Sequence, residues 1–142
     1  MRHHLVLRVV TKIMIPVIVL YALYIQFHGE YSPGGGFQAG IIFAASFVIY
    51  SLIYGLEVAQ DAISPRVARS LAALGVLLYI GVGLASIVLG GKFLEYKVLL
   101  ADDQAGETLG IIAIELGVGI TVATVALTLF YSFAGREPGE QE

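Results

Sequence analysis

The sequence predicts an all-α integral membrane protein with four transmembrane helices. Hydrophobic residues make up 58% of the 142-residue chain and charged residues only 13%, whereas soluble domains carry about 25% charged residues. Four apolar segments approach or exceed the roughly 20 residues that a helix needs to cross the hydrocarbon core. They are residues 5–27, 37–56, 70–91 and 109–134. The length fits one membrane domain over residues 1–142, with a short polar tail at 135–142.

Each predicted span follows from its composition. The first carries Arg8 and Lys12 near its start, four residues apart and so on one helical face, from which both can reach the headgroups. The second and third contain no charged residue, and the fourth contains one acidic residue, Glu115. A helix that starts near Leu109 would place Glu115 roughly 9 Å below the outer membrane boundary, at about 1.5 Å per residue.

A glycine-rich turn separates the first two spans. It consists of Pro33-Gly34-Gly35-Gly36-Phe37-Gln38-Ala39-Gly40. Proline fixes φ and prevents a helix from running through the turn, and successive glycines allow backbone angles and close approaches that other residues do not. A simple hydrophobic anchor would not need such a turn.

The distribution of basic residues predicts that both termini face the cytoplasm. Six lysines and arginines fall on one side of the predicted spans: Arg2, Arg8, Lys12, Arg66, Arg69 and Arg136. Only two fall on the other side, Lys92 and Lys97. By the positive-inside rule, the glycine-rich turn and an acidic loop then face outward. That loop, with Asp102, Asp103 and Glu107, is interpreted as a solvated connector or, alternatively, as a weak electrostatic funnel for cations.

Glu115 and His28 are the candidates for an ion or proton pathway. An acidic group costs about 2.5 to 3.5 kcal/mol at mid-membrane and usually faces a bundle interior, a water cavity or a partner. The alternatives for Glu115 are a structural hydrogen bond, or a helix that starts nearer to residue 115 and leaves the carboxylate at the interface. His28 ends the first span on the same outer side, where it is either a proton relay or a polar anchor.

The sequence gives little support for catalysis, cofactors or nucleic acid. The absence of cysteine excludes disulfides and thiolate metal sites. The glycine run lacks the Lys-Ser/Thr pair of a phosphate-binding loop, and neither a Ser-His-Asp arrangement nor an HExxH motif is present. The 8 basic and 11 acidic residues offer no basic surface for nucleic acid. We expect neither an enzyme nor a metal or cofactor site.

Small residues recur at four-residue spacing in two spans, at Gly36, Gly40 and Ala44 and at Ala113, Gly117 and Thr121. In lipid, such rows let helices approach closely. They favour either a subunit packed among other membrane subunits or close packing among the four helices themselves.

Two runs resemble the MnhB/MrpB family, the B subunits of multisubunit Mrp-type Na+/H+ antiporters. They are Phe27-His28-Gly29 followed by Ser32-Pro33-Gly34-Gly35-Gly36-Phe37-Gln38-Ala39-Gly40, and Ile114-Glu115-Leu116-Gly117-Val118. The chain departs from many members at Phe27-His28-Gly29-Glu30, where an Arg-Gly-His-Asn-like sequence approaches the motif, and at Glu115, where aspartate is common. The first run also resembles B-type subunits of membrane-bound hydrogenases and related respiratory complexes.

The resemblance implies a small accessory subunit, in a prokaryotic cell membrane, of a complex that exchanges cytoplasmic Na+ for external H+. Its partners would be other membrane subunits, which carry the proton-pumping modules, and it would line or support the cation pathway. The motif residues that would shape the turn and helix contacts are Pro33, Gly34, Gly35, Gly36, Phe37, Gly40 and Gly117, with Glu115 as the acidic member. The alternatives are a sodium-handling subunit of a hydrogenase-type complex and a purely structural scaffold.

Overall fold

The computed structural model describes residues 2–29 and 33–135, and it confirms the predicted all-helical membrane fold. Within these residues there is no strand, and four helices are long and apolar enough to cross a membrane. These are α1 (Arg2–Phe27), α2 (Gly36–Tyr54), α4 (Pro65–Val88) and α5 (Asp103–Ala134). The connections contain a short helix, α3 (Leu56–Ala62), and a 3-10 helix, η1 (Tyr96–Leu99). Glu30, Ser32 and the predicted tail beyond Gly135 lie outside the described residues.

The helix ends differ from the predicted span ends where glycine, proline or a capping side chain intervenes. The second span ends at Tyr54 because Gly55 adopts a φ of 106°, and the chain then continues as α3. The third begins at Pro65 rather than Ser70, since Ser64 caps the helix by accepting a hydrogen bond from the Val67 amide at 3.3 Å.

The prediction of an acidic loop at residues 102–107 was wrong. Asp102 is the N-cap of α5 and accepts a hydrogen bond from the Ala105 amide at 3.3 Å, so the helix begins at Asp103. Carboxylates at a helix N-terminus satisfy its amides and interact favourably with its dipole. Glu107 is therefore helical, and its carboxylate lies 3.6 Å from the Lys97 ammonium in an exposed ion pair.

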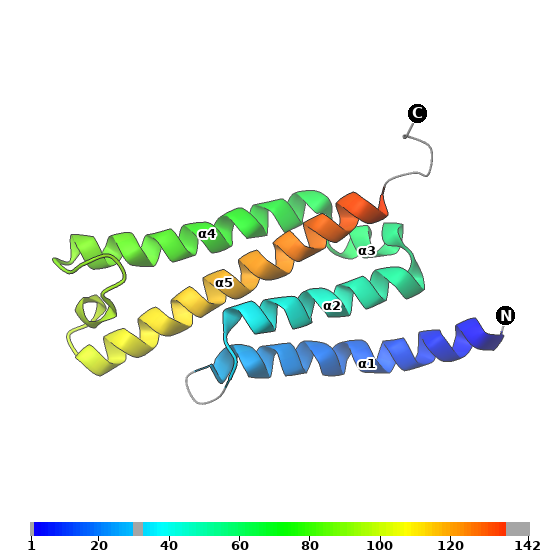
Figure 1. Cartoon of the computed structure of the whole chain (residues 1–142), viewed down its shortest axis with the longest axis horizontal. Coiled ribbons are helices and arrows are strands. Elements are labelled where there is room, and N and C mark those ends of the chain that lie inside the picture. Colours follow the sequence, from blue (N-terminus) through cyan, green and yellow to red (C-terminus); the bar gives the residue numbers. More distant parts are fainter. Residues whose placement is uncertain (1, 30–32, 136–142) are drawn as a thin grey trace.

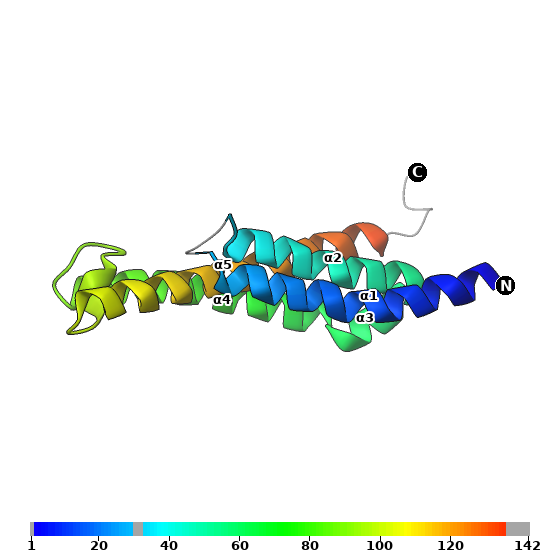
Figure 2. The same ribbon diagram turned by 90° about the horizontal axis from the view of Figure 1, so that it is seen from below.

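The four long helices lie side by side in the order α1, α2, α5, α4, with α1 and α4 at the edges (Figure 1). α2 packs on α1 and α5, and α5 packs on α2 and α4. Figure 2 shows the same helices from below, where they form a thin layer. α1 begins and α5 ends at the same end of the molecule (Figure 1), as the predicted topology requires. Which end faces the cytoplasm stays a prediction.

Glycines let α5 approach both neighbours closely. A methyl group added at Gly40 of α2 would lie 2.7 Å from the carbonyl oxygen of Gly119 in α5. One added at Gly117 of α5 would lie 2.9 Å from the carbonyl oxygen of Gly75 in α4. The small residues therefore pack helices of this chain against one another, which is the second of the two interpretations of their spacing. Backbone contact of this kind replaces hydrophobic burial as the source of helix association in lipid.

Candidate functional site

The carboxylate of Glu115 lies against the connection between α1 and α2. Glu115 is half-buried and belongs to the fourth turn of α5, twelve residues after Asp103. A methyl group added at Gly29 would lie 2.5 Å from Glu115 Oε1, and one added at Gly35 would lie 3.1 Å from the same oxygen. The structure thus joins the acidic candidate to the glycine-rich turn. A helix start near residue 115, one of the alternatives for Glu115, is wrong because α5 begins at Asp103.

The glycines of the turn occupy positions that a side chain would not fit. Gly35 is the N-cap of α2 and has a φ of 119°, which favours glycine over any other residue. A methyl group on Gly36 would overlap the carbonyl oxygen of Glu115 and lie 2.9 Å from the Gly119 amide nitrogen. One on Gly34 would lie 3.2 Å from the carbonyl oxygen of Ile25. Close contact between the start of α2 and α5 therefore depends on these glycines.

Two other predicted residues of the turn lie at its surface. Pro33 is exposed, and Phe37 has 60% of its surface exposed. His28 follows the end of α1 and is also exposed, and its ring stacks on Tyr24 with centroids 4.1 Å apart. His28 precedes Gly29 and so belongs to the same connection as the Glu115 contact. Its role as a proton relay stays a prediction.

The amino end of α2 lies beside the Glu115 carboxylate. The carboxylate approaches Gly35, where the first amides of α2 have no partner within their own helix. The aligned peptide dipoles add a partial positive charge at this end. The glycine-rich turn thus places the first turn of α2 beside this acid.

The site lies well short of the outer ends of α4 and α5. Both helices continue beyond the end of α1 and the start of α2 (Figures 1 and 2). Gly117 packs on Gly75 and Tyr79, so the part of α4 that follows Tyr79 lies beyond Glu115. That part exposes large apolar side chains, including Leu84 and Val88. Exposed apolar surface therefore continues along α4 past the site.

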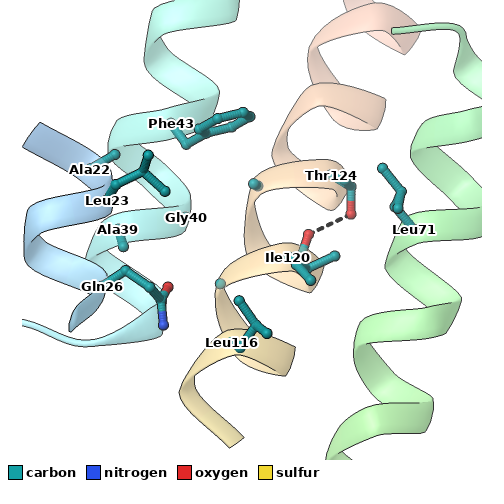
Figure 3. Close-up of a pocket in the computed structure, with 12 residues that line it drawn as sticks. Ala22, Leu23, Gln26, Ala39, Gly40, Phe43, Leu71, Leu116, Ile120 and Thr124 are labelled. Carbon is teal, nitrogen blue, oxygen red and sulfur yellow. Dashed lines mark hydrogen bonds between the residues drawn. The ribbon is translucent and has the colours of Figure 1, made fainter. Parts of the chain in front are cut away.

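A cavity of about 230 Å³ lies next to this site, between α1, α2, α4 and α5. Figure 3 shows Gln26 and Leu116 at one end of it and Phe43 and Thr124 farther along. Gln26 is only 8% exposed, and a methyl group added at Gly119 would overlap its Oε1 atom. Sequence reasoning missed Gln26, although an amide inside an otherwise apolar span was a usable signal.

The cavity is mainly apolar, and its polar side chains are few. The Thr124 hydroxyl donates a hydrogen bond to the Ile120 carbonyl at 2.7 Å within α5 (Figure 3). Apolar cavities of this size stay dry because a water molecule needs two to four polar partners. The cavity itself is therefore a poor route for a hydrated ion. In the part of the chain that the structure describes, no group of three or more His, Cys, Asp and Glu residues could hold a metal.

Comparison with known proteins identifies the family. The profile described as "Domain related to MnhB subunit of Na+/H+ antiporter" matches residues 6–128. The chain is 30% identical to "Putative antiporter subunit mnhB2" of Staphylococcus aureus (strain MRSA252) over 133 residues, which cover 92% of this chain and 94% of the relative. The protein of the same name in Staphylococcus haemolyticus (strain JCSC1435) is 28% identical over the same shares. The family match and the four apolar helices agree on a multi-pass protein of the cell membrane. The chain belongs to the MnhB family.

Proposed function

We propose that this chain, as an accessory subunit of a multisubunit Na+/H+ antiporter, contributes the Glu115 carboxylate to the cation or proton pathway. Family membership supports the first part of the proposal. The second part rests on one observation, the placement of Glu115 against the glycine-rich turn. A carboxylate can hold a cation or a proton in turn, as exchange of the two requires.

The sequence of the spans supports a functional role for this acid. Beyond Arg8 and Lys12, Glu115 is the only Asp, Glu, Lys or Arg within residues 5–27, 37–56, 70–91 and 109–134. Retaining a single charge at this depth is costly, and such residues usually mark ion or proton pathways.

The depth of the site supports a pathway that other subunits complete. Irregular backbone within the hydrocarbon layer is tolerated only where protein covers it or water reaches it. The connection that holds Gly29 and Gly35 is such backbone, and the cavity beside it is apolar. A hydrated route must then run along the outside of this chain, against neighbouring membrane subunits.

The experiment is Na+-dependent proton exchange in everted vesicles from cells that lack this subunit and carry either the wild-type gene or Glu115→Gln. Assembly of the complex is measured in parallel on native gels. We expect an assembled complex with exchange reduced about tenfold or more, since losing about 1.4 kcal/mol of interaction already changes a rate or affinity tenfold. Glu57→Gln is the matched control, because Glu57 is exposed on α3 at the opposite end of the molecule.

A scaffold role is the second candidate. The side-by-side helices leave two broad faces open to neighbours, and a subunit that only holds neighbours together would need no charge. Normal exchange and normal assembly in Glu115→Gln would favour the scaffold and refute the pathway role. The relatives found are named as antiporter subunits, which favours an antiporter over a hydrogenase-type complex.

A further inference from the structure

We infer that Gly29 is a positioning residue for Glu115, because the missing side chain at residue 29 leaves the space in which the carboxylate lies. The contact itself stands on geometry alone. Its consequence for transport rests on the proposed function of Glu115.

The atoms nearest to a methyl group added at Gly29 belong to the Glu115 carboxyl group. The three atoms nearest to an added methyl group are Oε1 at 2.5 Å, Oε2 at 3.0 Å and Cδ at 3.1 Å, all of Glu115. Ordinary contacts between carbon and oxygen begin at about 3.3 Å. Alanine at residue 29 would therefore meet the carboxyl group before it meets any backbone atom of α5.

Gly29 can be tested more cleanly than the other glycines near Glu115. Its φ lies outside the left-handed region, so alanine fits its backbone, whereas Gly35 has a φ of 119° and would be strained by any side chain. A methyl group on Gly36 would overlap backbone atoms of α5 and force the helices apart. At Gly29 the obstacle is the end of a flexible side chain, which moves at little cost.

The expected effect of alanine at residue 29 is a displaced carboxylate in a folded protein. Moving Oε1 from 2.5 Å to an ordinary contact requires a shift of roughly 1 Å. Misplacing a functional group by about 1 Å can reduce a rate by up to about 10²-fold. The shift would turn the carboxylate away from the connection between α1 and α2.

The test compares Gly29→Ala, Glu115→Asp and the double variant in the vesicle assay, with complex assembly measured in each. We expect Gly29→Ala to assemble and to raise several-fold the Na+ concentration for half-maximal exchange. In the Glu115→Asp background the same change should have almost no further effect, because the acid is one methylene shorter. Gly81→Ala is the control for adding a methyl group, since nothing lies within 4 Å of that position.

A merely structural role for Gly29 predicts a different result. Gly29→Ala would then reduce the amount of complex, leave the Na+ dependence of the remainder unchanged, and act equally in both backgrounds. That outcome, or a Gly29→Ala variant that behaves like Gly81→Ala throughout, would overturn the inference even if Glu115→Gln abolishes exchange.

The contact can also be measured apart from transport. The wild type, Gly29→Ala, Glu115→Asp and the double variant form a double-mutant cycle. The quantity compared is the melting temperature of the solubilised complex. If Gly29→Ala lowers the melting temperature less in the Glu115→Asp background than in the wild type, the contact is supported. If Glu115→Gln nevertheless leaves exchange normal, only the proposed function fails. If the two substitutions lower the melting temperature additively and the Na+ dependence of exchange is unchanged, the positioning role is refuted.

Discussion

The substitution Gly40→Ala tests whether backbone contact holds α2 against α5. The added methyl group would lie 2.7 Å from the carbonyl oxygen of Gly119 and 3.0 Å from Cβ of Val122. Restoring an ordinary carbon–oxygen contact requires the helices to separate by about 0.6 Å. Overpacking of this kind typically costs about 1–3 kcal/mol. Alanine also improves helix propensity by about 1 kcal/mol relative to glycine, so a variant without overlap should gain stability.

Gly81→Ala supplies that reference, because it changes glycine to alanine within α4 where nothing lies within 4 Å. The difference between the two variants isolates the overlap, which we expect to destabilise Gly40→Ala by about 1–3 kcal/mol relative to Gly81→Ala. The assay is the temperature at which half of this subunit has left the solubilised complex. Equal midpoints for the two variants would show that α2 and α5 are not packed through Gly40.

Two further predictions concern the anchoring of α3 and the orientation of the chain in the membrane. The Tyr131 hydroxyl donates to the α3 region, with carbonyl oxygens at 3.1 Å (Ile63) and 3.3 Å (Ala59). Tyr131→Phe should therefore cost about 1 kcal/mol and speed proteolysis of α3 in vesicles, and an unchanged cleavage rate would contradict this anchoring. Because the chain contains no cysteine, Asp61→Cys and Gln104→Cys can report topology with an impermeant maleimide. Everted vesicles should label Asp61→Cys only, and the reverse pattern would overturn the cytoplasmic assignment of the termini.

Hydropathy was sufficient to predict the four spans because a membrane helix needs a continuous apolar stretch, which is a local property. It was less reliable at helix ends. The fourth helix begins at Asp103 rather than Leu109 because the carboxylate of Asp102 caps it. A hydropathy window counts polar residues such as Asp103 and Glu107 against a helix, although carboxylates stabilise a helix N-terminus.

The contact between Glu115 and the glycine-rich turn could not be predicted from either motif separately. Gly29 and Gly35 lie far from Glu115 in sequence, and only the packing of α2 on α5 brings them together. The sequence marked each part as unusual, a charge inside a span and glycines beside a proline. Whether they come into contact depends on how α2 and α5 are aligned along their length. Gly36 fixes this alignment because it packs directly on the backbone of Glu115.

Under the proposed function, the arrangement of the helices accounts for a single acidic residue within the four predicted spans. α4 and α5 continue past the site, and no part of α1 or α2 covers their outer portions (Figure 1). Glu115 is half-buried, and its carboxylate lies against Gly29 and Gly35. Irregular backbone within a hydrocarbon layer is tolerated only where protein covers it or water reaches it. Under the proposed function, this chain supplies one acid and a shaped turn, and the surface of another subunit completes the pathway.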